Sequence, residues 1–382
     1  MKLLSVVGAR PNFMKIAPFI RAISDYNQSA NQKIEHILVH TGQHYDQNMS
    51  EAFFQELGIP RPDVNLGVGS GSHAEQVGIT MIELEKVFRK EKPDWVIVLG
   101  DVNATLAASV TAKKEHIKCA HIEAGLRSGD IKMPEEVNRL VTDRLSDLLF
   151  TPDRLSNENL KSEGVLDEKI KFVGNIMIDT LEAKRKKAAE HSIEQIIKSN
   201  SIHRPSPNAQ HPTPISYALM TMHRPSNVDD PDILSAIIDF LCDDVAAKMP
   251  LIWPIHPRTE ARLKEFALWD KLTDNQNIIV LHPLGYLDML RLNMDAGIML
   301  TDSGGLQEEC TVLGTPCITL RWNTERPVTL QEHGGASVLV GNDVSTARKE
   351  FRRMIQEKRK PAIPELWDGK TAGRILKEIL SF

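Results

Sequence analysis

Acidic side chains follow two neighbouring apolar segments in the middle of this chain of 382 residues. Asp101 stands just past the apolar run 95–99, and Glu123 comes directly after the run 119–122. If both runs are parallel strands, their carboxyl ends meet at one edge of the sheet, and the two carboxylates point toward the same cavity. Carboxylates in one cavity repel one another and lose solvent, which pushes their pKa values apart and suits them to proton transfer.

A further acidic pair, Glu135-Glu136, follows Pro134 at a predicted helix start, where the helix dipole favours negative charge. Together with the two strand-end acids, this pair would bring several carboxylates to one pocket. The alternative is purely structural, with Asp101 capping the next helix and the acidic pair capping its own. The residues alone leave both interpretations open.

Two other features are suited to bind phosphate. Arg10 and Lys15 flank a turn from the first apolar segment into a helix, where backbone amides already favour an anion. Ser303, Gly304 and Gly305 leave backbone amides uncovered at a later helix start, which suits a diphosphate. An acid a turn or two further on can accept hydrogen bonds from ribose hydroxyls. For the first feature, the alternative is a pair of solvated cations beside a tight turn.

The second half of the chain has more polar residues at the ends of its apolar segments. His223-Arg224 follows the first of these segments, and His256 follows the second. We expect His223, Arg10, Arg326 and the turn at 303–305 to face one cleft between two domains.

An alternation of strands and helices is needed to position these residues, and the first half of the chain has that pattern. Short apolar runs, typical of strands buried on both faces, alternate with segments of helical periodicity. We expect strands at 3–7, 37–40, 95–99, 119–122, 148–150 and 170–173. We expect helices beginning near Met14 and at 49–57, 74–90, 105–114 and 135–145, with a Gly/Pro-rich loop at 58–72. This order predicts a doubly wound parallel sheet.

The pattern is interrupted at 181–198, a charged helical segment, and at 200–214, a polar and Pro-rich loop. It then resumes, with strands expected at 217–222, 251–255, 278–281, 297–300, 317–320 and 338–340, and a last helix at 373–380 that could pack back on the first domain. We therefore predict an N-terminal Rossmann-like domain with the carboxylates over 1–174 plus 366–382. We predict a C-terminal, nucleotide-binding domain over 175–365.

The composition is that of a water-soluble globular protein, with 41% hydrophobic and 25% charged residues. A net charge of -5 argues against nucleic acid or an anionic membrane as the main partner. No segment approaches the ~20 apolar residues of a membrane span, and the first apolar run is too short for a signal peptide. The four cysteines form no CxxC pair, so we expect buried thiols in a cytoplasmic protein.

Eight motifs of this chain, in unbroken order from residue 1 to about residue 340, closely resemble those of the UDP-N-acetylglucosamine 2-epimerase family. They are VGARPNFMK at 7–15, TGQH at 41–44, GDVNAT at 100–105, HIEAGLRSGD at 121–130, MPEEVNR at 133–139, HR at 223–224, DSGGLQEE at 302–309 and TERP at 324–327. The resemblance implies an α/β, GT-B-like fold of two Rossmann-like doubly wound domains, with the active site in the interdomain cleft.

The resemblance also implies an activity, the reversible epimerisation at C2 that interconverts UDP-N-acetylglucosamine and UDP-N-acetylmannosamine. Anti elimination of UDP gives a 2-acetamidoglucal intermediate, and UDP adds back after C2 is reprotonated from the other face. No redox cofactor or metal is implied. Consistently, residues 8–11 are not a GxGxxG dinucleotide fingerprint. The partners implied are the UDP-sugar substrate and a second subunit in a homodimer.

Roles carried over from the resemblance fall on residues of the motifs above. The implied catalytic residues are Asp101, Glu123, Glu135 and His223. The implied substrate-binding residues are Arg10, Lys15, Ser303, Gly304, Gly305, Glu309 and Arg326, with Ser303, Gly304 and Gly305 cradling the diphosphate and Glu309 accepting from the ribose. Gln43 and His44 correspond to positions that bind a second, activating UDP-GlcNAc in some bacterial members.

The chain departs from the family pattern at two places that matter for function. The loop 66–72 lacks the arginine that helps to bind the activator, which argues against activation by substrate. Some relatives read HRRE where this chain has HRPS at 223–226. Three alternatives also stay open: a hydrolysing 2-epimerase that releases ManNAc and UDP, a 2-epimerase of a UDP-diacetamido uronic acid, and a GT-B glycosyltransferase or non-catalytic nucleotide-sugar binding protein.

Overall fold

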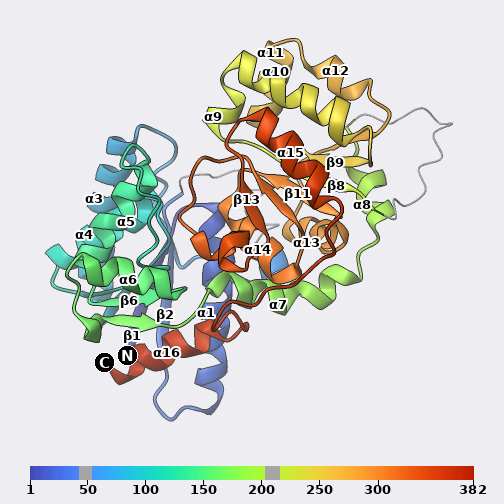
Figure 1. The fold of residues 1–382 in the computed structure, drawn as a ribbon. Helices are drawn as coiled ribbons and strands as arrows, with labels where there is room; N and C mark the ends of the chain where they lie inside the picture. Colours follow the sequence, from blue (N-terminus) through green and yellow to red (C-terminus); the bar gives the residue numbers. More distant parts are fainter. Residues whose placement is uncertain (43–53, 203–215) are drawn as a thin grey trace. The chain divides into compact units, whose positions relative to one another are not determined.

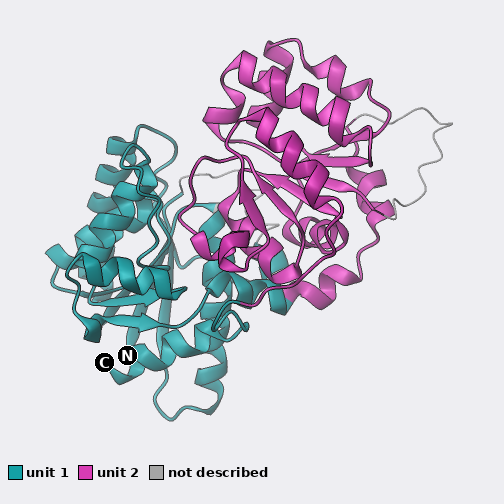
Figure 2. Ribbon diagram, viewed as in Figure 1, with its two compact units in different colours: residues 1–183, 364–382 teal, residues 184–363 magenta. Residues whose placement is uncertain are grey.

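The computed structural model describes residues 1–42, 54–202 and 216–382 of the chain (Figure 1). These residues form two compact units (Figure 2). Unit 1 comprises Met1–Ala183 and Pro364–Phe382, and unit 2 comprises Lys184–Ile363. Among the described residues, no helix combines the length and apolar character needed to cross a membrane.

Unit 1 is built on a seven-stranded parallel sheet in the order β3-β2-β1-β4-β5-β6-β7. Its strands are β1 (Lys2–Val7), β2 (Glu35–His40), β3 (Val64–Asn65), β4 (Trp95–Leu99), β5 (Lys118–Ile122), β6 (Leu148–Thr151) and β7 (Ile170–Phe172). All five residues of β4 are buried, as expected for a parallel strand covered by helices on both faces.

Helices cover both faces of this sheet (Figure 1). They are α1 (Arg10–Ser29), α3 (His73–Glu91), α4 (Asn103–Lys114), α5 (Pro134–Leu145), α6 (Arg154–Ser162) and α16 (Thr371–Ser381). The chain then passes from unit 1 into unit 2 within α7 (Ile176–Ala189). Helix α16 packs against α1, so the end of the chain completes the unit with which the chain begins.

Unit 2 repeats the arrangement with a six-stranded parallel sheet in the order β10-β9-β8-β11-β12-β13. Its strands are β8 (Ala218–Thr221), β9 (Leu251–Pro254), β10 (Ile278–Leu281), β11 (Ile298–Thr301), β12 (Cys317–Thr319) and β13 (Ser337–Leu339). Its helices are α8 (Ile193–Asn200), α9 (Pro225–Val228), α10 (Pro231–Phe240), α11 (Pro257–Glu265), α12 (Trp269–Thr273), α13 (Tyr286–Asp295), α14 (Gly304–Leu313) and α15 (Val344–Met354). The strands are again apolar on both faces.

The structure confirms the predicted strands to within two residues at each end, and it corrects the start of the first helix. Helix α1 begins at Arg10, not near Met14, because Asn12 stabilises its first turn. The Asn12 side-chain oxygen accepts hydrogen bonds from the amides of Gly8 and Ala9, at 3.1 and 3.3 Å. Pro11 at the helix start fits this geometry, since its missing N–H has no helical partner to lose.

Other helices also differ from expectation. The segment 181–198 is not one helix, because α7 ends at Ala189 and Ser192 caps a new helix, α8. The sequence pattern missed α6 altogether, and the expected loop at 58–72 contains the two-residue strand β3. Of the helix expected at 49–57, residues 54–57 are helical and the others lie outside the described part of the chain.

Candidate active site

Each sheet has a topological switch point, and the candidate residues lie just beyond it. In unit 1, β1 lies between β2 and β4, and in unit 2, β8 lies between β9 and β11. Connections leave the two central strands of each sheet toward opposite faces, which opens a crevice at their carboxyl ends. The turn after β4 carries Asp101, and the turns after β8 and β11 carry His223 and Asp302. The positions inferred from strand ends therefore coincide with the place where α/β sheets bind ligands.

Lys15 and Glu123 form a buried ion pair at the switch point of unit 1. Helix α1 directs the Lys15 ammonium to the carboxylate that follows β5, and the two side chains are 6% and 3% exposed. Gly100 lies against this pair, because a Cβ there would stand 2.6 Å from Lys15 Nζ. Burial makes the pairing necessary, since an isolated charge in this place would be strongly destabilised.

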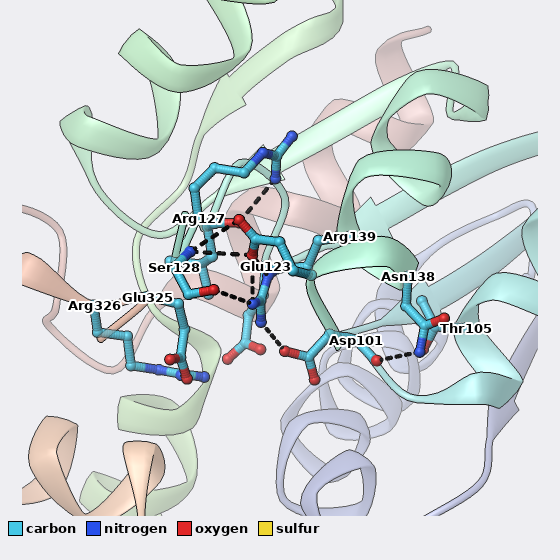
Figure 3. A network of polar contacts seen from close by, with 12 residues as sticks. Asp101, Thr105, Glu123, Arg127, Ser128, Asn138, Arg139, Glu325 and Arg326 are labelled. Atoms are coloured by element: carbon cyan, nitrogen blue, oxygen red, sulfur yellow. Dashed lines mark hydrogen bonds and ion pairs between the residues drawn. The ribbon is translucent and has the colours of Figure 1, made fainter. Parts of the chain in front are cut away.

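Asp101 belongs to a second network, with Arg139 of α5 at its centre (Figure 3). The Arg139 guanidinium pairs with the Asp101 carboxylate and, at 2.6 Å, with Glu136. The Asp101 carbonyl accepts a hydrogen bond from Asn138 at 2.8 Å. Burial opposes ionisation of Glu136, but hydrogen bonds from the Ser128 amide and from Arg139 outweigh it and lower the Glu136 pKa. Asp101 is thus fixed by its pairing with Arg139, and its side chain remains 23% exposed to solvent.

Neither Asp101 nor Glu136 caps a helix, so the structural interpretation of these two acids is wrong. The N-cap residue of α4 is Val102, and no side chain caps that helix, so Asp101 does not serve this purpose. Glu136 does not cap α5 either, since it accepts from the amides of Ser128 and Gly129 in the preceding loop. Glu135 is exposed at the first turn of α5.

In unit 2, Asp302 organises the turn after the neighbouring strand β8. Its fully buried carboxylate accepts hydrogen bonds from the amides of His223 and Arg224, at 2.9 and 2.7 Å. It also pairs with His223 Nδ1 at 3.0 Å. Burial opposes ionisation of Asp302, but its bonds to His223 outweigh it and lower the Asp302 pKa. The Asp302 carboxylate therefore lies beside Nδ1 of the half-exposed His223 ring, and Nε2 is on the opposite side of the ring.

The N-terminus of α14 has the form of an anion site. Ser303 is the N-cap residue, without a side-chain cap, and Gly304 and Gly305 form the start of the first turn. A Cβ on Gly304 would stand 2.7 Å from Arg326 Nη1, so the guanidinium lies directly beside this turn. Arg326 is buried and paired with Glu308 at 2.7 Å and with Glu325. The site thus combines uncovered amides and a helix dipole with a guanidinium whose charge is shared with Glu308 and Glu325.

Glu309 lies on the same helix as this anion site, and its carboxyl group is 3% exposed. Burial raises its pKa to about 7, although hydrogen bonding with Tyr286 and Asn293 opposes the rise. The carboxyl group therefore exchanges its proton near neutral pH, so its hydrogen-bonding capacity changes in that range.

Several predicted residues have no described side chain or environment. The Arg10 side chain, Gln43 and His44 lie outside the described part of the structure. In that described part, there is no group of three or more His, Cys, Asp or Glu side chains arranged to hold a metal ion.

The residues that hold the candidate site together are not apparent from the sequence alone. Arg139, Asn138 and Asp302 stand inside the motifs, but no sequence pattern assigns a role to them. A signal for Arg139 was present, because Arg139 follows Glu136 at the i,i+3 spacing that brings helical side chains together. Asp302 ends a buried strand and has no such partner within its own element.

Comparison with known proteins gives a consistent result. The family described as UDP-N-acetylglucosamine 2-epimerase matches residues 27–380. The UDP-N-acetylglucosamine 2-epimerase of Methanocaldococcus jannaschii is 42% identical over 379 residues, which cover 99% of this chain and 98% of the relative. The UDP-2,3-diacetamido-2,3-dideoxy-D-glucuronate 2-epimerase of Pseudomonas aeruginosa is 39% identical over 395 aligned residues, with 100% and 99% covered.

The structural comparison agrees with the sequence comparison. The crystal structure of the M. jannaschii UDP-GlcNAc 2-epimerase in complex with UDP-GlcNAc and UDP matches with a TM-score of 0.88 at 41% identity, covering 100% of both chains. The prediction of an α/β, GT-B-like fold with two doubly wound sheets is confirmed. The chain belongs to the UDP-N-acetylglucosamine 2-epimerase family of isomerases.

Proposed function

We propose that this protein interconverts UDP-N-acetylglucosamine and UDP-N-acetylmannosamine by eliminating UDP and adding it back. The observation that carries the proposal is the pair of carboxylates, Asp101 and Glu123, held in cationic networks at the switch point of unit 1. The names and full-length similarity of the relatives from M. jannaschii support it.

The proposed reaction begins with loss of the C2 proton to a carboxylate base. The electron pair forms the C1–C2 double bond, and the C1–O bond breaks as UDP leaves with its electrons. A proton then returns to C2 from the opposite face, and UDP adds to C1. Inversion at C2 needs a proton-transfer group on each face of the sugar, which requires more than one of Asp101, Glu123 and Glu135.

Unit 2 supplies the groups that the leaving UDP requires. Negative charge develops on the diphosphate as the C1–O bond breaks, and fixed donors stabilise it best because they need no reorganisation. We assign this role to the amides of Gly304 and Gly305, to Arg326 and to His223 Nε2. We assign the ribose hydroxyls to Glu309.

Proton NMR of the purified protein with UDP-GlcNAc in D2O tests the proposal. We expect UDP-ManNAc to form and C2 of both sugars to gain deuterium, because the base exchanges its proton with solvent. Formation of epimer without C2 deuterium would refute the elimination mechanism. Free ManNAc together with UDP would identify a hydrolysing enzyme.

Three variants test the catalytic assignment. Asp101→Asn, Glu123→Gln and Glu135→Gln keep the side-chain volume but remove a proton acceptor, so turnover should fall roughly 10²- to 10⁴-fold. Glu158→Gln, at an exposed position of α6, is the matched control and should be unaffected. Near-normal turnover in all three variants would refute the assignment.

A second substrate has a specific observation in its favour. The P. aeruginosa relative, named for a UDP-diacetamido-glucuronate, is 39% identical over the full chain. The same elimination would apply, since it involves only C1 and C2 of the sugar. Parallel assays with both UDP-sugars, compared by kcat/KM, decide between the two substrates.

A further inference from the structure

His121 is a fully buried histidine of β5 that the proposed mechanism does not use. Its ring lies between two turns at the edge of the sheet. Nδ1 lies 2.6 Å from Asp143 Oδ1, and Nε2 lies 2.8 Å from the Gly100 carbonyl oxygen. Both ring nitrogens therefore make short contacts with oxygen atoms.

The chemistry of those two oxygens determines the protons on the ring. A backbone carbonyl can only accept a hydrogen bond, so Nε2 must carry a proton. Asp143 is held as a carboxylate by groups other than the ring, because Arg127 pairs with its Oδ2 at 2.7 Å and the Gly125 amide donates to the same oxygen at 3.0 Å. An ionised carboxylate also only accepts, so Nδ1 must carry a proton as well. A ring with two N–H donors is an imidazolium.

Neighbouring charges compensate the buried imidazolium. Asp143 of α5 is shared, because Arg127 pairs with its second oxygen at 2.7 Å. Arg127 in turn pairs with Glu163 at 2.7 Å. The negative charges of Asp143 and Glu163 thus balance the positive charges of Arg127 and the ring.

The ring connects the two turns that carry the candidate carboxylates. Gly100 precedes Asp101 and has φ of +62°, in the left-handed region. Glu123 itself has φ of +70°, which is uncommon for a residue with a side chain. On the same side, the Asp143 carboxylate accepts a hydrogen bond from the Gly125 amide at 3.0 Å. The His121–Asp143 pair thus contacts both turns: His121 contacts the Gly100 carbonyl, and Asp143 contacts the Gly125 amide.

We infer that the His121 ring donates from both nitrogens, ties the turn after β4 to the turn after β5, and so positions Asp101 and Glu123 for proton transfer. It is a positioning residue, because it acts on the reaction only through these turns. A neutral ring has only one N–H group. It could donate to Asp143 or to the Gly100 carbonyl but not to both, so one of the two contacts would be lost. The inference rests on the proposed function for its kinetic consequence, whereas the protonation state of the ring does not depend on it.

Nitrogen NMR of the wild-type protein, labelled with ¹⁵N-histidine, tests the protonation state directly. The His121 signals are assigned by their absence from His121→Gln or His121→Asn, whichever variant folds. We expect both ring nitrogens to have protonated shifts in the folded protein, because both face hydrogen-bond acceptors. A neutral tautomer, with one ring nitrogen unprotonated, would overturn the inference.

Kinetics of His121→Gln test the positioning role. The glutamine side chain is neutral and has one donor group, so it cannot hold both turns. We expect kcat of the folded variant to fall about 10- to 100-fold, in line with a misplacement of catalytic groups, while the dissociation constant of UDP changes little. The melting temperature should also fall, because Asp143 loses a buried partner, so kcat is measured at a temperature at which the variant is folded. Unchanged kcat would overturn the positioning role.

A control and an independent variant complete the test. His36→Gln replaces a half-buried histidine that contacts Ser5 at 2.9 Å, and it should leave kcat unchanged. Asp143→Asn should lower kcat as His121→Gln does, and the double variant should be no worse than either single one. Additive losses would overturn the shared role. If wild-type protein turns over no UDP-sugar, the proposed function fails, while the NMR result still decides the charge on His121.

Discussion

At the scale of single residues, the candidate site consists mainly of charged side chains that are buried and form ion pairs. Lys15 and Glu123 have almost no solvent to stabilise them, so each depends on the other. Asp101 differs, because its partner Arg139 is buried while its own side chain remains partly accessible. Asp101 is therefore the more accessible of the two carboxylates.

Removing one partner of the buried pair should destabilise the protein strongly. Lys15→Met removes the ammonium that pairs with the buried Glu123 carboxylate, and we expect the free energy of unfolding to fall by about 3–5 kcal/mol. Urea denaturation measures the change. Lys86→Met breaks an exposed pair with Glu83 and should cost no more than about 1 kcal/mol. Equal effects for the two variants would contradict the argument.

Glu309 should make stability depend on pH in a defined direction. Its folded pKa of about 7 lies above the ordinary value of 4.5. The folded state therefore holds this proton more tightly, and the associated stability is fully present below about pH 4.5 and is lost as the pH rises through 7. Ionising the buried group costs up to about 3 kcal/mol.

Glu309→Gln removes that titration and tests the prediction. We expect the variant to gain stability relative to wild-type as the pH is raised from about 5 to about 8, measured by thermal or urea unfolding at both pH values. A stability difference that is the same at both values would show that Glu309 does not titrate in this range.

At the scale of elements, the sequence predicted the strands well because each is a short, continuous apolar run. The strand ends then located Asp101, Glu123 and the Ser303 turn without any knowledge of contacts. The partners of these residues could not be located in this way. Arg139 and Asp143 reach the site from α5, and their relation to β4 and β5 depends on how the helix packs on the sheet.

The helix boundaries were harder to predict for a related reason. Asn12 fixes the start of α1 through side-chain bonds to two preceding amides and, at 2.8 Å, to the Leu99 carbonyl of β4. The spacing of apolar residues in the sequence does not reveal these hydrogen bonds. Likewise, the break between α7 and α8 depends on the local cap at Ser192 and not on a change in apolar pattern.

Helix α16 provides a test at this scale, because a residue of another helix caps it. Asp179 of α7 accepts hydrogen bonds from the amides of Thr371 and Ala372, at 3.0 and 2.8 Å. We expect Asp179→Ala to cost about 1–2 kcal/mol and to speed amide exchange in α16. The matched control is Asp343→Ala, which removes the cap of α15 in unit 2 and should leave exchange in α16 unchanged. Slow exchange of α16 amides in Asp179→Ala would contradict the assignment.

At the scale of the whole molecule, the two units differ in how the chain completes them. Unit 2 is one continuous stretch with its own sheet and core. Unit 1 needs the returning segment 364–382, in which the buried Trp367 donates a hydrogen bond to the Pro152 carbonyl at 2.9 Å. At the end of the chain, the Phe382 ring packs edge-on against Trp95, with ring centroids 5.3 Å apart.

This asymmetry predicts which part of the protein can be isolated. Every residue that we assign to UDP lies in unit 2, so a protein of residues 190–363 should fold cooperatively and bind UDP about as tightly as the full chain does. Residues 1–183 should fold only when 364–382 are joined to them. Calorimetry with UDP and urea unfolding measure both expectations, and Gly304→Val, which crowds Arg326, should abolish binding in the isolated unit. If the isolated unit folds but binds no UDP while the full chain does, residues of unit 1 must contribute to UDP binding, and the assignment of the diphosphate to unit 2 alone is wrong.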